Sequence, residues 1–189
     1  MTKGQVRDEL LARRRAMSTA TRVEAADAIA MHALAVPIVS RARRVACYLS
    51  MPSEPGTGPL LARLAARGIE AIVPITLEDH TLDWIAYDPE APLATSSIGI
   101  PEPLGPRLGA AALRDCDAVI VPALAVDHAG HRLGRGAGFY DRALAAVSVP
   151  LCALVYAHEL LPALPHEPHD IPVHMAVTPA GLFRVPEAG

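Results

Sequence analysis

The sequence has little of several features that would assign a protein to a functional class at once. Aromatic residues make up only 4% of its 189 residues, and the formal net charge is -3. So small a charge provides no general attraction to nucleic acid or to an anionic membrane surface. We therefore expect neither a nucleic-acid partner nor a membrane partner. Hydrophobic residues make up 51% of the chain, which suits an ordinary globular core.

Long apolar runs and a cysteine framework are also missing. The apolar runs near residues 118–126 and 147–157 are shorter than the roughly 20 residues that span a bilayer. The N-terminus lacks the apolar core of a signal peptide. The three cysteines, Cys47, Cys116 and Cys152, are odd in number and irregularly spaced, which favours buried thiols in a reducing compartment. These absences predict a cytoplasmic protein.

The apolar residues that are present alternate between helix-like and strand-like segments. Helices are predicted over residues 3–17, 21–35, 59–67 and 140–147. Buried strands are predicted over residues 45–49, 71–75, 118–121, 152–156 and 175–177, with a more exposed strand over 82–87 and a long connection over 88–107. The pattern predicts an α/β fold in which residues 1–189 form one domain, with N-terminal helices and a mostly parallel central sheet sandwiched by helices. Ligands of such sheets bind at the carboxyl ends of the strands.

The most informative segment is a glycine-rich loop after the strand at 118–121. Because residues 134, 136 and 138 are glycines, alternate positions of this loop carry no side chain. Arg132 and Arg135 give the loop positive charge. Since a helix-like segment follows, bare backbone N–H groups and the helix N-terminus can bind a polyphosphate. Asp141 is placed to approach a metal ion carried by those phosphates. The segment therefore predicts a nucleotide-binding loop.

Other interpretations of the loop remain open at this point. The sequence has no G-x-x-x-x-G-K-[ST] phosphate-binding motif. A dinucleotide-binding loop is a closer rival, with Glu159 as a ribose-binding acid. However, the spacing is G-x-G-x-G, and about a dozen residues separate Val121 from Gly134, whereas a dinucleotide loop turns directly off its strand. The third interpretation is a surface loop without a ligand.

The sequence RLGRGAGFYD at residues 132–141 resembles the signature of the 5-formyltetrahydrofolate cyclo-ligase family. Residues 121–127 resemble the strand and lead-in that precede this signature. Weaker similarities follow in the family's order over nearly the whole chain. They are Lys3 and Arg7 as a K-x-x-x-R element, Tyr48-Leu49-Ser50 with Glu54, the G-I-x-E-P turn at 99–103, and the segments 165–170 and 177–178.

The resemblance implies an enzyme that uses ATP and Mg²⁺ to convert 5-formyltetrahydrofolate to 5,10-methenyltetrahydrofolate, releasing ADP and phosphate. In the family's proposed mechanism the formyl oxygen attacks the γ-phosphoryl group, after which N10 closes the ring and phosphate leaves. The protein then has to align two substrates and neutralise charge on the transferred group. A monomer is expected.

The resemblance also assigns roles to particular residues. Arg132 and Arg135 would be catalytic, and Asp141 would hold Mg²⁺. Leu49, Glu54 and Tyr140 would bind the folate. The ATP-binding residues would be Lys3, Arg7, Arg132, Leu133, Gly134, Arg135, Gly136, Ala137, Gly138, Phe139 and Tyr140.

Several of these residues have ordinary structural alternatives. Lys3 and Arg7 could be solvated charges on a terminal helix, and Glu102 of the G-I-x-E-P turn is expected to be structural. Histidines 166, 169 and 174, with Asp170, fit no common zinc spacing, so no zinc site is predicted.

One position departs from the family pattern. His174 stands where the family has a second magnesium-binding acid, which predicts either that Asp170 or a water replaces it or that magnesium binds weakly. A homologue that binds nucleotide or folate with weak or no turnover is therefore the alternative to the enzyme.

Overall fold

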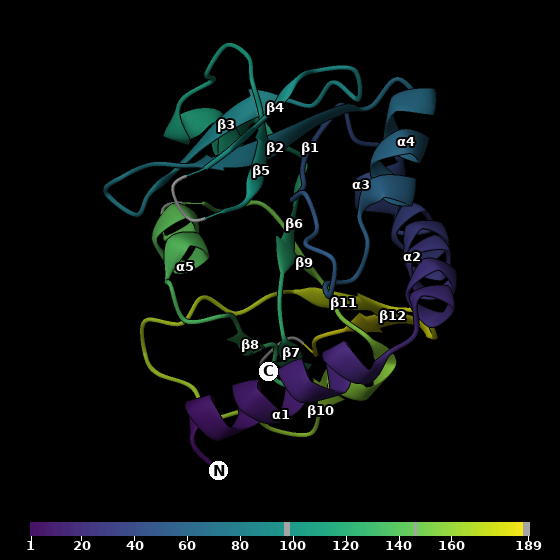
Figure 1. Ribbon diagram of the computed structural model, residues 1–189, viewed down its shortest axis with the longest axis vertical. Helices are drawn as coiled ribbons and strands as arrows, with labels where there is room; N and C mark the ends of the chain where they lie inside the picture. The colour runs from purple at the N-terminus through teal and green to yellow at the C-terminus, as the bar shows by residue number, and fades with distance from the viewer. Residues whose placement is uncertain (97–98, 146, 187–189) are drawn as a thin grey trace.

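Short runs of Val, Ile, Ala and Leu build the central sheet, as expected for strands buried on both faces. In the computed structural model, which describes residues 1–96, 99–145 and 147–186, this sheet has seven strands in the order β12-β11-β9-β6-β1-β2-β3 (Figure 1). Their bounds are β1 (Arg44–Ala46), β2 (Glu70–Thr76), β3 (Leu82–Ala86), β6 (Ala118–Pro122), β9 (Leu151–Leu154), β11 (Met175–Thr178) and β12 (Gly181–Arg184).

The sheet is parallel except at its two edges. Strands β2, β1, β6, β9 and β11 are parallel neighbours, whereas β3 and β12 are antiparallel to β2 and β11. In the centre, Val45 of β1 pairs with Ala71 of β2 on one side and with Ala118 of β6 on the other. From β1 the chain first builds outward through β2 and β3, then returns to add β6 on the other side. The boundary between β1 and β6 is therefore a topological switch point, where α/β sheets bind ligands.

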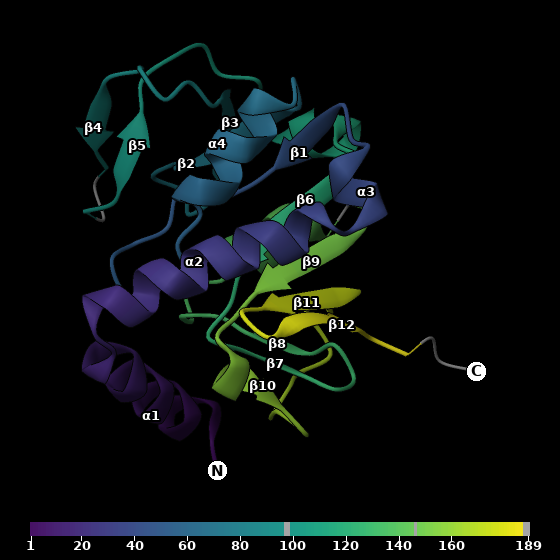
Figure 2. The same ribbon diagram turned by 90° about the vertical axis from the view of Figure 1, so that its right-hand side faces the viewer.

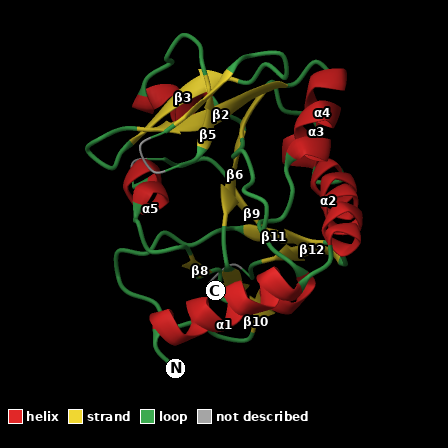
Figure 3. Ribbon diagram, in the orientation of Figure 1, coloured by secondary structure: helices red, strands yellow, loops and turns green. Residues whose placement is uncertain are grey.

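Helices cover both faces of the sheet because successive strand residues point to opposite sides. Ala118 and Ile120 of β6 pack with α2 (Thr19–Leu34), α3 (Pro37–Ser40) and α4 (Gly58–Ala66). Val119 and Val121 pack on the opposite face, with η1 (Ala110–Asp115), a 3-10 helix, and α5 (Phe139–Leu144). Figure 3 shows α5 and α2 on opposite sides of the sheet.

The first helix, α1 (Lys3–Ala16), packs on a smaller three-stranded sheet. This sheet has the order β10-β7-β8 and consists of β7 (Ala125–Asp127), β8 (Arg132–Leu133) and β10 (Leu160–Leu161). Val6 and Leu10 of the helix share an apolar cluster with Leu124 and Leu133. Figure 2 shows α1 beyond the end of the main sheet, beside β10. The packing brings the N-terminus of the chain to the glycine-rich loop, which follows β8 directly.

The predicted α/β class with a mostly parallel sheet is confirmed, with corrections in detail. The strand expected to be more exposed, β3, is buried from Leu82 to Ile85, because the segment leading into η1 covers it. In that cover, the Leu108 N–H donates to the Trp84 carbonyl at 2.8 Å. The 88–107 connection contains a hairpin of β4 (Leu93–Thr95) and β5 (Pro101–Pro103). The helix predicted over 140–147 ends at Leu144 instead, and residue 146 lies outside the described residues.

The three cysteines, all within the described part of the chain, are buried free thiols, as predicted. Burial raises the pKa of Cys47 and Cys152 to about 12 and that of Cys116 to about 11, so none is a reactive thiolate at neutral pH. Among the described residues, no helix has the length and apolarity needed to cross a bilayer.

Candidate active site

A cavity of about 340 Å³ opens beside the switch point of the sheet. Its walls include Tyr48 and Leu49, which follow β1, Thr76 at the end of β2, and Pro122 and Ala123 at the end of β6. The cavity therefore lies at the carboxyl ends of the parallel strands, where the sequence predicts a ligand site.

The cavity brings together every residue that the sequence singles out as a site residue. The segment 132–141 forms one wall, Lys3 and Arg7 come from α1, and Leu49 and Glu54 come from the loop after β1. Their roles remain predictions, but a placement of Lys3 and Arg7 on an isolated solvated face does not fit the structure. Residues separated by more than 120 positions in the chain thus meet around one space.

The glycine-rich loop needs its glycines for backbone conformation as well as for space. Gly136 has φ 101° and Gly138 has φ 71°, values that side-chain-bearing residues rarely adopt. Arg7 Nε donates to the Gly134 carbonyl at 2.9 Å, and a Cβ on Gly136 would lie 3.5 Å from the Arg7 guanidinium carbon. The loop and the first turns of α1 are therefore fitted closely to each other.

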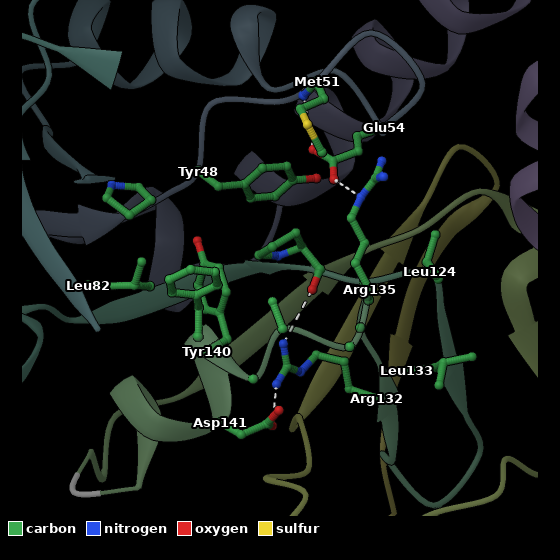
Figure 4. A pocket seen from close by; sticks show the side chains of 18 of the residues that line it. Tyr48, Met51, Glu54, Leu82, Leu124, Arg132, Leu133, Arg135, Tyr140 and Asp141 are labelled. Atoms are coloured by element: carbon green, nitrogen blue, oxygen red, sulfur yellow. Dashed lines mark hydrogen bonds and ion pairs between the residues drawn. The ribbon is translucent and has the colours of Figure 1, made fainter. Parts of the chain in front are cut away.

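Arg132 is buried at the base of the cavity, where it pairs with Asp141 (Figure 4). Its Nη2 donates to Asp141 Oδ1 at 2.6 Å, and its guanidinium carbon lies 5.8 Å from the centre of the Tyr140 ring. Arg132 Nε and the Tyr140 hydroxyl are buried and have no hydrogen-bond partner among the described residues. Burial also raises the pKa of Tyr140, which keeps its hydroxyl protonated. Two polar groups are thus left for a ligand to satisfy.

Arg135 reaches across the cavity to the loop that follows β1, as Figure 4 shows. Its Nε donates to Glu54 Oε1 at 3.1 Å, while Glu54 Oε2 accepts from the Met51 N–H at 2.9 Å. The Glu54 side chain is only 8% exposed, whereas that of Arg135 is 39% exposed. The arginine is therefore the more exposed partner of this ion pair.

Lys3 binds two acids from the segment that precedes β11. Its Nζ lies 2.7 Å from Glu167 Oε2 and 2.6 Å from Asp170 Oδ2. Burial is the largest single influence and would raise the pKa of Asp170, but the hydrogen bonds from Lys3 and from the Glu167 N–H, together with the positive charge of Lys3, lower the pKa overall. Possible metal ligands of Glu167, His169 and Asp170 lie within 4.8 Å of one another. Of the histidines weighed for zinc, this group contains His169 alone.

The sequence suggests that His174 replaces a magnesium-binding acid. The structure does not support this expectation, because it places His174 outside the cavity. His174 lies just before β11, and its Nδ1 accepts from the Leu151 N–H at 3.0 Å. Because Leu151 begins β9, His174 sits at the amino end of a parallel strand, away from the cavity walls. Asp170, by contrast, lines the cavity. The case for a homologue without turnover depended on His174, and it loses its basis here.

Several residues of the cavity wall are not predicted as site residues, either because they come from segments without a local motif or because, like Glu102, they are expected to be structural. Glu102 of β5 reaches Thr76 at the end of β2 and accepts from both its N–H and its hydroxyl at 2.7 Å. The connection 88–107 therefore forms part of the site, with Ile100 and Pro101 beside Glu102. Arg14, Tyr48, Met51 and Leu82 also line the cavity.

The fold and the cavity define a class: doubly wound α/β proteins with a cationic, glycine-lined ligand site at the switch point of the sheet. Comparison with known proteins narrows this class. The sequence model of the 5-formyltetrahydrofolate cyclo-ligase family matches residues 1–179. The chain belongs to this family.

Named relatives and solved structures agree with that assignment. The chain is 38% identical to the 5-formyltetrahydrofolate cyclo-ligase of Mycolicibacterium smegmatis, with 94% of each chain covered. It is 34% identical to that of Escherichia coli K12, with 91% of this chain and 97% of the relative covered. The solved 5,10-methenyltetrahydrofolate synthetase of Aquifex aeolicus superposes with a TM-score of 0.85 at 28% identity, covering 100% of this chain and 95% of that one. The corresponding Mycoplasma pneumoniae structure, with a TM-score of 0.72 at 19% identity over 94% and 98%, supports the fold.

Proposed function

We propose that this protein catalyses the ATP-dependent cyclisation of 5-formyltetrahydrofolate to 5,10-methenyltetrahydrofolate. The observation that carries the proposal is the composition of this cavity. One side offers a glycine-rich loop with two arginines, suited to phosphates, and the other offers a buried carboxylate and apolar side chains, suited to a pterin. Family membership supplies the reaction that needs both kinds of surface at once.

The ATP half of the site is assigned to the loop and to α1. The backbone N–H groups of residues 134–138 cradle the phosphates, with Leu133 and Phe139 flanking them. Lys3 and Arg7 approach from the N-terminal helix, and both line the cavity. Lys3 exchanges Glu167 and Asp170 for phosphate oxygens, which are equally good partners for an ammonium group.

The folate half is assigned to Leu49, Glu54 and Tyr140. A carboxylate can accept two hydrogen bonds from the amino and N–H edge of a pterin, and Glu54 is nearly buried at the cavity wall. Leu49 and the ring of Tyr140 supply apolar contact. The buried Tyr140 hydroxyl, without a partner among the described residues, donates to the folate or to the transferred phosphoryl group.

Magnesium fits the oxygen donors at the base of the cavity. Asp141 lines it, and Asp170, proposed as the second acid, belongs to a segment whose Ile171 N–H lies 3.5 Å from Asp141 Oδ1. Hard cations prefer carboxylate and phosphate oxygens. A bound ion would neutralise charge on the phosphates. Asp141 would hold it in place of Arg132, and the Arg132 guanidinium group would then be available to the transferred group.

The chemistry requires activation of a formamide oxygen, which is a poor leaving group. This oxygen attacks the γ-phosphorus, the bond to the ADP oxygen breaks, and an imidate phosphate forms. N10 then attacks the formyl carbon and loses its proton, and phosphate departs with the former formyl oxygen. Arg132 and Arg135 stabilise the charge on the transferred group. The protein supplies no nucleophile, because the formyl oxygen and N10 of the substrate carry out both attacks. We further propose that the protein acts as a monomer.

One assay separates the possible functions. The protein is incubated with 5-formyltetrahydrofolate and MgATP without a nicotinamide cofactor, and the absorbance of the methenyl product is followed. Product formation that requires ATP supports the proposal. Tight binding of both substrates without product would instead support the binding homologue, and dependence on NAD(P) would support an oxidoreductase.

A further inference from the structure

A buried ion pair lies behind the cavity, between α1 and the turn after β9. Arg14 and Glu159 have side chains that are 1% and 0% exposed. Arg14 Nε and Nη2 donate to the two carboxylate oxygens at 2.7 and 2.8 Å, and Nη2 also donates to the Ala123 carbonyl at 2.6 Å. Burying two charges is unfavourable unless geometry and further hydrogen bonds offset the loss of water, so such a pair is weak evidence for stability. The geometry of the Arg14–Glu159 pair instead fixes the orientation of the residues that it contacts.

The residue that the pair holds is Tyr156, at the end of β9. Glu159 Oε2 accepts from the Tyr156 backbone N–H at 2.8 Å, and the Arg14 guanidinium carbon lies 5.5 Å from the centre of the tyrosine ring. Tyr156 is 2% exposed, and its hydroxyl donates to the backbone carbonyl of Glu54 at 3.1 Å. A continuous set of contacts therefore runs from α1 to the loop that carries the Glu54 carboxylate.

This loop has little regular structure of its own to hold Glu54 in place. Its internal hydrogen bonds include those from the Glu54 N–H to the Met51 carbonyl and from the Met51 N–H to Glu54 Oε2, both 2.9 Å. Besides Tyr156, the buried hydroxyl of Tyr48 donates to the next carbonyl, that of Pro55, at 3.2 Å. Tyr48 lines the cavity and can touch a ligand, whereas Tyr156 is not among the lining residues. The Tyr156 hydroxyl reaches the site through the Glu54 backbone.

We propose that Tyr156, oriented by the Arg14–Glu159 pair, is a positioning residue for the folate half of the site. It sets where the Glu54 carboxylate stands, without contacting substrate. The proposal deepens the proposed function and rests on it, because it assumes that Glu54 binds the pterin.

The test is Tyr156→Phe, which removes one oxygen atom and keeps the ring beside Arg14. Losing one hydrogen bond corresponds to about a fivefold change in an equilibrium constant. We expect the KM for 5-formyltetrahydrofolate to rise about fivefold. The KM for ATP and kcat should stay within about twofold, because the substitution removes no direct contact of Arg132, Arg135 or the glycine-rich loop. Tyr87→Phe is the matched control, since Tyr87 is partly buried against the core and is not a lining residue. It leaves all three constants unchanged.

A second measurement does not depend on turnover. Amide hydrogen exchange of the Glu54 N–H should become faster in Tyr156→Phe than in the wild type, and stay unchanged in Tyr87→Phe. Failure of the proposed function would appear in the wild type itself, as absence of the methenyl product. The positioning role is overturned if exchange at Glu54 is unaltered. It is also overturned if both KM values and kcat change together in proportion to a lowered melting temperature, which would indicate a structural role alone.

Discussion

Replacing Glu54 with glutamine should tighten the binding of nucleotide, although Glu54 is assigned to folate. In the structure its carboxylate holds Arg135, the arginine assigned to the phosphates, through one contact of 3.1 Å. ATP therefore has to compete with Glu54 for this guanidinium group. A neutral amide holds an arginine less strongly than a carboxylate does, so Glu54→Gln removes most of that competition.

The structure bounds the size of this effect. Arg135 is 39% exposed and the pair has a single short contact, so it resembles a surface ion pair more than a buried one. Such pairs contribute about 0.5 to 1 kcal/mol, which corresponds to about two- to fivefold in affinity. By linkage, nucleotide that draws Arg135 away from Glu54 favours folate binding by the same factor in the wild type, and this coupling is lost in the variant.

The assay is calorimetric titration with a non-hydrolysable ATP analogue and Mg²⁺, in the absence of folate. Glu102→Gln is the matched control, because it removes the same charge from the same cavity while Glu102 bonds to Thr76 and not to an arginine. An unchanged or weaker affinity in Glu54→Gln would refute the competition. Equal tightening in Glu102→Gln would show that net charge alone is responsible.

Three further predictions follow from named contacts. Arg135→Ala and Asp141→Ala should each lower kcat at least about 100-fold, in line with other charge-stabilising groups. The melting temperature should change little in Arg135→Ala and fall in Asp141→Ala, which leaves the buried Arg132 without its charge partner; wild-type turnover in either would remove its assigned role. Gly136→Ala should weaken nucleotide binding about tenfold, because φ 101° strains any side chain, whereas Gly134→Ala, with open space and no such φ, is its control in the same titration. Hydrogen bonds from the Arg43 and Arg44 N–H groups lower the pKa of Asp117, so its stabilising contribution is present above its unfolded pKa of about 3.9 and is lost as pH falls through its lower folded pKa. Asp117→Asn should therefore lose less unfolding free energy than the wild type between pH 5 and pH 2, as measured by urea titration; parallel curves would contradict this linkage.

The parts of the fold that sequence predicts are those encoded locally. The run at 118–121 is apolar without interruption, and a strand buried on both faces is the element that such a run forms. The three short strands β7, β8 and β10 lack that signal because they depend on α1 packing over them. The burial of β3 likewise depends on a covering segment some twenty residues further along the chain, which no window around Trp84 contains.

The candidate site likewise has a part that the sequence predicts and a part that depends on tertiary packing. The glycine-rich loop, its arginines and Asp141 are contiguous, so spacing alone makes them visible. The sequence Arg13-Arg14-Arg15 does not indicate that its middle residue is buried. In the structure, the Arg13 side chain is 53% exposed and that of Arg14 is 1% exposed. Its partner Glu159 is 145 positions away, and the bond between Thr76 and Glu102 joins residues 26 apart. Pairings over such separations are set by tertiary packing, which a single sequence does not display.

The hairpin β4–β5 gives the protein a way to change its substrate range. Its strands form a sheet separate from the main one, β4 is exposed along its whole length, and Glu102 attaches the hairpin to the end of β2. Exchanges in this segment reshape one wall of the cavity while the parallel strands keep their packing. We therefore expect substitutions in this segment to alter which folates the cavity accepts before they alter the architecture of the sheet.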